Sequence, residues 1–363
     1  MVILWDCGSH DPGSNLGPGL LILIMTESEN PTITTVCSHT SLQIFDGARK
    51  EGFKTLGICL GEPPKFYDAF PRAKPDEFFP VDSYQEIMEK THELIERDAI
   101  IIPHGSFVEY LGASNFARLD VPSFGNKKVL EWESDRIKER EWLTSAGVPV
   151  PAEYRSPDEI AGPVIVKYHG AKGGRGFFIA KNQREFEEQI DQNEEHVIQE
   201  FVLGTRYYLH FFYSPLRKDG YQVCDGTLEL HGIDRRVESN IDELYKIGAS
   251  AGIDPSFVVT GNLPLVLRES LLPKVFLLGE RVVARSIELF GGMIGPFCLE
   301  TVCTDTLEFK VFEISARIVA GTNLFISGSP YSDLIEPGLS TGRRIAQEIG
   351  LAIEMGRLDE VVS

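Results

Sequence analysis

A lysine on a short apolar stretch precedes a glycine-rich basic loop between residues 163 and 178. Lys167 follows the β-branched run Val164–Val166, which is typical of a strand. The loop after it carries Lys172 and Arg175 among four glycines, Gly170, Gly173, Gly174 and Gly176. Because glycines let backbone N–H groups approach phosphate oxygens and the cations offset their charge, this pattern predicts a nucleoside triphosphate site. It is not a P-loop, since G-x-x-x-x-G-K-[ST] is absent. An ordinary solvated hairpin is the alternative.

Two glutamates, Glu300 and Glu313, lie in the predicted strands 297–303 and 307–315. If a two-residue turn joins these strands, the glutamates are diagonal neighbours on one face, roughly 7–8 Å apart at Cα. Two such carboxylates repel unless a positive group lies between them, and Mg²⁺ commonly takes carboxylates together with substrate phosphates. Arg317 follows two residues later and could reach the same region. A solvent-facing sheet with two unrelated glutamates is the alternative.

Clusters of histidine and hydroxyl side chains follow two predicted strands in the first third of the chain. Ser-His-Thr-Ser at 38–41 follows the strand 33–37, and His104-Gly105-Ser106 follows the strand 99–102. In open α/β sheets, ligands bind at the carboxyl ends of strands, where helix N-termini can hold phosphates. The alternative is that the hydroxyls are plain helix caps and the histidines bind backbone groups.

The composition is that of a globular protein large enough for two or three domains. Its 363 residues include 35 Lys and Arg against 54 Asp and Glu, a net charge of −19, which argues against a broad nucleic-acid footprint. Neither an apolar run long enough to span a membrane nor a signal-peptide pattern appears, so no membrane partner is expected. Six scattered cysteines without zinc spacing favour free thiols in the cytoplasm.

The order of predicted elements indicates an α/β protein in two parts. Residues 25–125 alternate strands and helices, which predicts a doubly wound, Rossmann-like domain, and residues 126–363 form the second domain. Residues 1–24 are rich in Gly and Pro, and we expect a non-native or disordered extension before Met25. In the second part we expect one charged helix over 127–146 and a turn at 260–264.

Three further positions carry weaker signals. Glu200 and Val202 end a predicted strand beginning at residue 196, where backbone groups could meet an adenine edge. Arg235 and Arg236 lie where a strand is expected to pass into a loop, either as solvated side chains or as anion ligands.

A strand lysine, a glycine-rich basic loop, an acidic strand end and two strand glutamates, in this order, resemble the ATP-grasp fold. Longer stretches are similar to the archaeal formate-dependent 5-formaminoimidazole-4-carboxamide ribonucleotide synthetases. These are Ser-His-Thr-Ser at 38–41, Pro-His-Gly-Ser-Phe at 103–107, Val-Lys at 166–167, Gly-Gly-Arg-Gly at 173–176, Glu-Ser-Asn-Ile-Asp at 238–242, Thr-Gly-Asn at 260–262, Arg-Glu-Ser-Leu-Leu-Pro at 268–273, Met-Ile-Gly-Pro-Phe-Cys-Leu at 293–299 and Phe-Glu-Ile-Ser-Ala-Arg at 312–317. The resemblance runs from about residue 33 to the end of the chain.

The resemblance implies a ligase that joins formate to 5-aminoimidazole-4-carboxamide ribonucleotide with ATP, through formyl phosphate, in purine biosynthesis. It implies catalytic roles for Lys167, Arg175 and Arg317, and contacts to the ribonucleotide from His39, Ser106 and Asn262. It places ATP among Lys167, Lys172, Gly173, Gly174, Arg175, Gly176, Glu200, Val202 and Glu238, with Mg²⁺ or Mn²⁺ on Glu300 and Glu313. Ser315 stands where many ATP-grasp ligases carry a metal-binding Asn, which leaves the third ligand open.

Two other functions remain possible from the residues alone. One is a related ligase that uses another acid or amine, and the other is a nucleotide-binding regulator without turnover. Survival of Lys167, Glu300 and Glu313 weighs against the regulator. The expected partners are small molecules and further copies of the same chain in a homo-oligomer.

Overall fold

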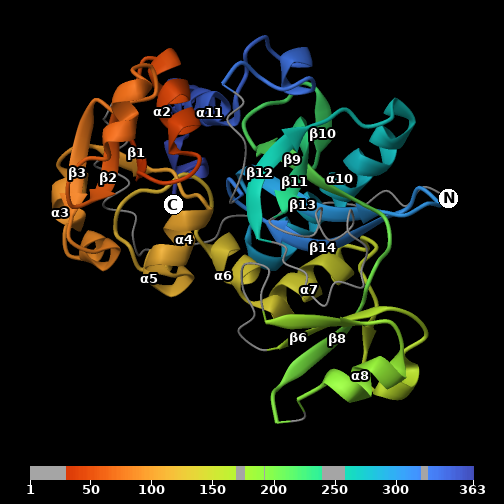
Figure 1. Ribbon diagram of the computed structural model, residues 1–363. Helices are drawn as coiled ribbons and strands as arrows, with labels where there is room; N and C mark the ends of the chain where they lie inside the picture. Colours follow the sequence, from red (N-terminus) through yellow and green to blue (C-terminus); the bar gives the residue numbers. More distant parts are fainter. Residues whose placement is uncertain (1–29, 169–175, 192, 239–257, 320–325) are drawn as a thin grey trace.

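Three β-sheets with helices on their faces make up the protein, seen in a computed structural model that describes residues 30–168, 176–191, 193–238, 258–319 and 326–363. Figure 1 shows the N-terminal sheet on one side, a large sheet at the centre and a small sheet below it. The architecture is mixed α/β, as the sequence predicts.

The N-terminal sheet is parallel, with strand order β3-β2-β1-β4. Its strands are β1 (Thr32–Val36), β2 (Lys54–Leu60), β3 (Glu77–Val81) and β4 (Ala99–Ile101). The chain winds outward from β1 to β3 and then returns to the other side of β1. The switch in winding direction therefore falls between β1 and β4, where doubly wound sheets bind ligands at the carboxyl ends of their strands.

Helices cover both faces of this sheet. Successive strand residues point to opposite faces, so Ile100 packs with Ile44 and Ile345 while Ile101 packs with Phe107. The helical elements in this part are α2 (Ser41–Lys50), η1 (Lys65–Ala69), η2 (Tyr84–Met88), α3 (Thr91–Ile95), α4 (Gly105–Leu111) and α5 (Ala113–Ala117).

The large sheet is antiparallel, with order β10-β11-β9-β13-β14 and β12 paired to β11. Its strands are β9 (Thr205–Ser214), β10 (Tyr221–Val223), β11 (Gly226–Glu238), β12 (Val259–Pro264), β13 (Gly295–Cys303) and β14 (Phe309–Ser315). All nine residues of β13 are buried. The helix α10 (Leu272–Phe290), preceded by η4 (Glu269–Leu271), packs on the face that carries Phe211 and Leu228.

The small sheet is antiparallel, with order β5-β8-β6-β7. Its strands are β5 (Glu153–Tyr154), β6 (Val164–Tyr168), β7 (Phe177–Ala180) and β8 (His196–Glu200), and η3 (Pro157–Glu159) and α8 (Gln183–Gln189) accompany them. Val164, Val166 and Ile198 pack on Phe186 of α8 to form a core of its own. The opposite face of this sheet is thus left for contact with the rest of the protein.

Three local expectations were wrong. The charged stretch 127–146 is two helices, α6 (Lys128–Ser134) and α7 (Arg136–Ser145), because Asp135 is extended (φ −99°, ψ 111°) and caps α7 by accepting from the N–H groups of Ile137 and Lys138. Residues 260–264 are not a turn but most of β12. The β13–β14 connection is longer than two residues, with Leu307 at φ 61°, and a bulge follows between Glu300 and Thr301.

The C-terminal helix returns to the N-terminal sheet. Thr341–Met355 forms α11, preceded by η5 (Ser332–Leu334) and followed by η6 (Leu358–Glu360). It lies against α2, and two glycines permit the approach: a Cβ on Gly47 would fall 2.2 Å from the Arg343 nitrogen, and one on Gly342 would fall 2.1 Å from the Gln43 oxygen. The division at residue 125 stays a prediction, with α11 joining the two parts.

No helix in the described part of the chain is long and apolar enough to cross a membrane. Among the described cysteines, Cys37, Cys59, Cys298 and Cys303 are free thiols, as expected. Cys224 is disulfide-bonded, so the expectation of free thiols throughout was wrong for this residue.

Candidate active site

The two histidine-containing junctions meet at the carboxyl ends of β1 and β4. The hydroxyl of Ser38 donates to that of Ser106 (3.0 Å), and the rings of His39 and His104 lie 5.3 Å apart. His104 is fully buried and donates from Nε2 to the carbonyl of Val36 (3.2 Å). The predicted grouping of His39 with Ser106 is therefore present in the structure, while His104 serves as a buried support.

Both imidazoles are held neutral. Burial lowers the pKa of His104 to about 3, with a smaller contribution from the charge of His39. Burial also lowers the pKa of His39, assisted by the positive charge of Arg317. Neutral rings at this position can donate and accept hydrogen bonds without adding charge.

A cavity of about 400 Å³ opens beside this junction, lined by residues 37–40, Leu42, Gln43 and Phe66. Its volume is in the range of small-molecule sites. Thr40 lies at the start of α2 with φ 69°, and its buried hydroxyl has no hydrogen-bond partner among the described residues. The cavity thus combines apolar lining with one hydroxyl that has no partner among the described residues.

Glu300 and Glu313 lie directly opposite each other on β13 and β14, not diagonally as the assumed turn required. The bulge after Glu300 changes the register and makes them a facing pair. Burial raises the pKa of Glu300, the charge of Glu313 raises it further, and Arg236 opposes both. Two facing carboxylates in a buried sheet need compensating positive charge.

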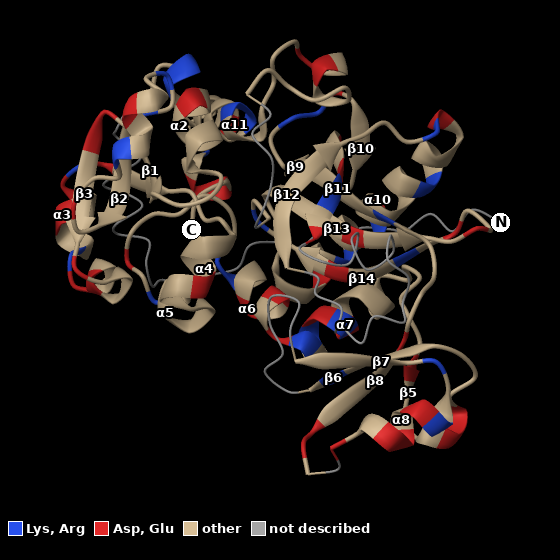
Figure 2. Ribbon diagram, in the orientation of Figure 1, with Lys and Arg blue, Asp and Glu red and all other residues tan. Residues whose placement is uncertain are grey.

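Two more glutamates reach this pair from α6 and α7. Glu139 accepts a hydrogen bond from the N–H of Ile314 (2.7 Å), and Glu133 accepts one from the N–H of Ala316 (2.8 Å). Burial raises the pKa of both carboxyls, and Glu313 raises them further. Figure 2 shows acidic residues of α6, α7, β13 and β14 near the centre of the molecule.

The sequence reasoning missed Glu133 and Glu139. In one continuous helix, residues six apart point about 120° away from each other, so they could not both face one strand. The break at Asp135 redirects α7 along β14 and brings both carboxylates to its outer edge. An Asp within a run of charged residues is a helix-cap signal that could have indicated this break.

Arginines balance the carboxylates. The guanidinium of Arg236 donates to both oxygens of Glu300 (2.9 and 3.3 Å) and lies over the ring of Tyr208 (3.9 Å from its centre). Arg236 is part of β11, which ends two residues later at Glu238. Arg317 pairs with Glu133 at 2.5 Å. The site is thus a mixed-charge cluster and not an acidic patch.

Lys167 faces the carboxylates from the small sheet. Its ammonium donates to Oε1 of Gln199 (3.0 Å). Burial lowers its pKa, and Glu313 is the largest of the charges that raise it again. Lys167 on the small sheet therefore lies close enough to Glu313 on the large sheet for their charges to interact.

The structure describes some of the other residues predicted to bind ATP. Glu200 pairs with Lys310 (2.5 and 2.6 Å) and accepts from the N–H of Ala152 (3.0 Å), which links β8 to β14. Val202 follows β8, and Glu238 ends β11 in an ion pair with Arg206 (2.5 Å). Gly176 has φ 75°. Lys172, Gly173, Gly174 and Arg175 lie outside the described residues.

Asn262 lies on β12 and pairs in register with Arg236 on β11. Its buried Oδ1 has no hydrogen-bond partner among the described residues.

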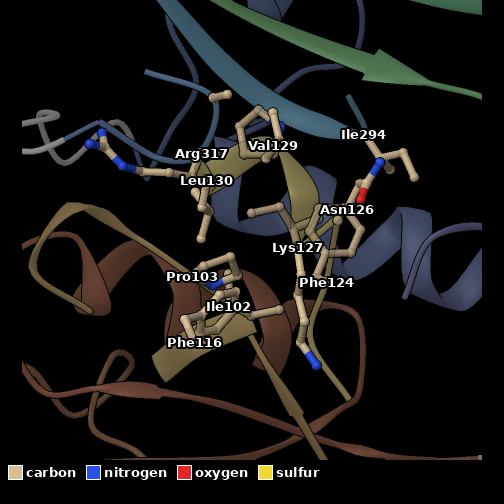
Figure 3. A pocket seen from close by; sticks show the side chains of 14 residues that line it. Ile102, Pro103, Phe116, Phe124, Asn126, Lys127, Val129, Leu130, Ile294 and Arg317 are labelled. Carbon is tan, nitrogen blue, oxygen red and sulfur yellow. The ribbon is translucent and has the colours of Figure 1, made fainter. Parts of the chain in front are cut away.

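A second hollow of only about 20 Å³ adjoins the site, between Pro103, Phe124 and Leu130. Figure 3 shows Arg317 on its rim with the guanidinium directed away from Phe124 and Asn126. A space of this size holds one water at most, so it is not the ligand cavity.

The donor set fits a hard divalent cation. Glu300 and Glu313 offer facing carboxylates whose mutual repulsion a cation would relieve, and oxygen ligands are those that Mg²⁺ and Mn²⁺ prefer. No cluster of three or more His, Cys, Asp or Glu side chains that could hold a metal ion is found in the described ranges. The third protein ligand stays open, since Ser315 supplies only a buried hydroxyl.

Comparison with solved structures defines the class first. An N5-carboxyaminoimidazole ribonucleotide synthetase, solved as its ADP complex, is 15% identical and superimposes with a TM-score of 0.57 over 79% of this chain and 71% of that one. The shared fold is that of the ATP-grasp ligases, as the order of sequence features predicts.

Closer relatives show the family. A 5-formaminoimidazole-4-carboxamide-1-(beta)-D-ribofuranosyl 5'-monophosphate synthetase of Methanothrix thermoacetophila is 68% identical over 95% of this chain and 98% of its own length. An IMP biosynthesis protein from Thermococcus kodakaraensis, a solved structure, is 32% identical, with a TM-score of 0.73 over 91% of this chain and all of that one. Residues 33–154 match a family described as "Protein of unknown function (DUF1246)" and residues 179–363 one described as "Domain of unknown function (DUF1297)". The chain belongs to the family of 5-formaminoimidazole-4-carboxamide ribonucleotide synthetases.

Proposed function

We propose that this protein is an ATP-dependent ligase that joins formate to the amino group of 5-aminoimidazole-4-carboxamide ribonucleotide, releasing ADP and phosphate. The observation that carries the proposal is the convergence of Lys167, the facing pair Glu300 and Glu313, and Arg317 beside the His39 junction. Family membership supports the substrate, and the ADP complex of a protein with the same fold supports the nucleotide.

The reaction needs two displacements and no protein nucleophile. A formate oxygen attacks the γ-phosphorus, the bond to ADP breaks, and formyl phosphate forms. The amine then attacks the formyl carbon, the bond to phosphate breaks, and the nitrogen gives up a proton that the released phosphate can accept. Both steps depend on alignment and on neutralising negative charge.

The residues divide between these two tasks. Lys167 and Arg317 offset charge on the transferring phosphoryl group, and Arg175 is proposed to do so from the loop. His39, Ser106 and Asn262 are proposed to hold the ribonucleotide in and beside the 400 Å³ cavity. Glu300 and Glu313 would hold Mg²⁺ or Mn²⁺, which would supply positive charge to offset that of the phosphates.

For the nucleotide itself, we propose the cleft between the two antiparallel sheets. Glu200 ends β8 and Val202 lies two residues beyond it, where their backbone groups can meet the adenine edge, and Glu238 lies at the end of β11. The glycines Gly173, Gly174 and Gly176 and the side chain of Lys172 are proposed to cover the phosphates. A homo-oligomer in the cytoplasm remains a prediction that the structure does not test.

The test is product analysis with ¹⁴C-formate, ATP and the ribonucleotide. We expect labelled formamido product and ADP in equal amounts, and no product when acetate replaces formate. Release of ADP without labelled product would contradict the proposed acceptor. Activity with acetate equal to that with formate would contradict the proposed acid.

A further inference from the structure

Glu133 holds both the backbone and the side chain of one dipeptide, Ala316–Arg317. Its Oε2 accepts the N–H of Ala316 (2.8 Å), and its Oε1 pairs with Nη2 of Arg317 (2.5 Å). The side chains of Glu133 and Arg317 are only 9% and 14% exposed. A carboxylate that binds two successive residues through its two oxygens leaves little freedom to the arginine.

The chain on the other side of Arg317 is tied to the N-terminal sheet. The carbonyl of Ile318 accepts the N–H of Gly105 (3.1 Å), and His104 and Ile318 form a parallel bridge. Arg317 therefore lies between α6 and the start of α4, with its backbone fixed from both directions. It is the residue at which the carboxylate cluster meets the histidine junction.

Two nitrogens of Arg317 remain unused. Nε and Nη1 are buried and have no hydrogen-bond partner among the described residues. Leaving buried charged donors unsatisfied is unfavourable, so a structural ion pair alone does not account for them. An anionic ligand in the cleft would supply the missing acceptors.

We propose that Glu133 is a positioning residue for the ligase reaction, which aims the free Nε and Nη1 donors of Arg317 at the anionic reacting group. This inference depends on the proposed function, because it assigns the arginine to the phosphorylated reactants of that reaction. Glu133 itself touches no substrate. Its carboxylate fixes the direction of the guanidinium before the substrates arrive, which avoids reorientation during the reaction.

A double-mutant cycle tests the proposal with the full-length protein. The variants are Glu133→Gln, Arg317→Gln and the two combined, and kcat and KM are measured with labelled formate. We expect Glu133→Gln to lower kcat about tenfold or more while the KM for ATP changes less than about twofold. In the Arg317→Gln background the same change should have less than about twofold effect, because nothing remains to be positioned.

The matched control is Glu131→Gln on the same helix. Glu131 is exposed and pairs with Lys138 on α7, away from Arg317, so its loss should leave kcat within about twofold. Equal losses from Glu133→Gln in both backgrounds, or an unchanged kcat in the single variant, would overturn the proposal. A wild-type protein that makes no labelled product would instead refute the proposed function.

Folding is checked by thermal unfolding of each variant. If Glu133→Gln does not fold, Glu133→Asp decides, because it keeps the charge and withdraws the carboxylate by one methylene. A lower kcat with a melting temperature near that of the wild type supports positioning. An unchanged kcat in a folded Glu133→Asp variant overturns it.

Discussion

The site has two walls, the His39–His104 junction and the β13–β14 edge, and they accommodate buried ionisable groups differently. At the His39–His104 junction, burial keeps the imidazoles neutral, and His104 donates one hydrogen bond to the carbonyl of Val36. At the β13–β14 edge, burial raises the pKa of Glu133, Glu139 and Glu300, and arginines oppose this rise at Glu133 and Glu300. One wall is therefore suited to bind a ligand by fit and hydrogen bonds. The other is suited to a ligand that brings both phosphate charge and a cation.

The largest effect should come from the charged wall. Replacing Glu313 by Gln removes one of the two facing carboxylates, and we expect kcat/KM to fall about 10³-fold, or about 4 kcal/mol of transition-state stabilisation. Glu308→Gln on the same hairpin is the control, since Glu308 is exposed and pairs with Lys274. Turnover of Glu313→Gln at the wild-type rate would show that the metal assignment is wrong.

The next largest effect should come from the contact between α2 and α11. Gly47 lies inside a helix, where alanine is ordinarily better by up to about 1 kcal/mol, but its Cβ would meet the backbone of α11. We expect Gly47→Ala to lower the free energy of unfolding by about 2–3 kcal/mol in urea titrations. The comparison is Gly350→Ala in α11, whose Cβ would meet only the Phe53 ring at 3.8 Å, and which should be neutral or stabilising. Stabilisation by both substitutions would contradict the close packing of the two helices.

The neutral wall predicts a pH effect of intermediate size. Because the folded-state pKa of His104 is about 3, the unfolded chain binds more protons between pH 3 and 6.5, so stability falls as the pH falls through this window. Between pH 6.5 and 5 this amounts to about 1.6 kcal/mol. His104→Gln, which can still donate to Val36, should lose less stability than the wild type over that interval. Parallel stability curves for the two proteins would refute a buried neutral His104.

The smallest effect should come from the ligand-facing histidine. His39→Ala removes one hydrogen-bonding ring from the cavity, and we expect the KM for the ribonucleotide to rise about tenfold, or about 1.4 kcal/mol, with little change in the KM for ATP. His92→Ala, at an exposed histidine on α3, is the matched control. A rise in the KM for ATP alone would show that His39 contacts the nucleotide and not the ribonucleotide.

The family and the main groups of the site were accessible from local sequence patterns. Lys167 on its strand, the His39 and Ser106 junctions and the strands of Glu300 and Glu313 depend on short-range signals: β-branched runs, alternation and glycine positions. The register of Glu300 against Glu313 was not accessible, because a bulge and a longer turn shift it and neither leaves a clear pattern. Asn262 was expected in a turn and lies in a strand, since pairing with β11 outweighs the weak strand preference of Gly and Pro.

By itself the sequence indicated most of the candidate residues for the chemistry and, for most of these, the kind of element in which each one lies. Only the tertiary structure decided how they meet: that Glu133 and Glu139 reach β14 after the break at Asp135, that Arg317 joins the two walls, and that α11 returns to α2 through Gly47 and Gly342. The physical reason is the separation along the sequence of the groups that interact. Secondary structure follows from neighbours a few residues away, whereas the charge balance of this site sums over groups more than 150 residues apart, such as Glu133 and Arg317.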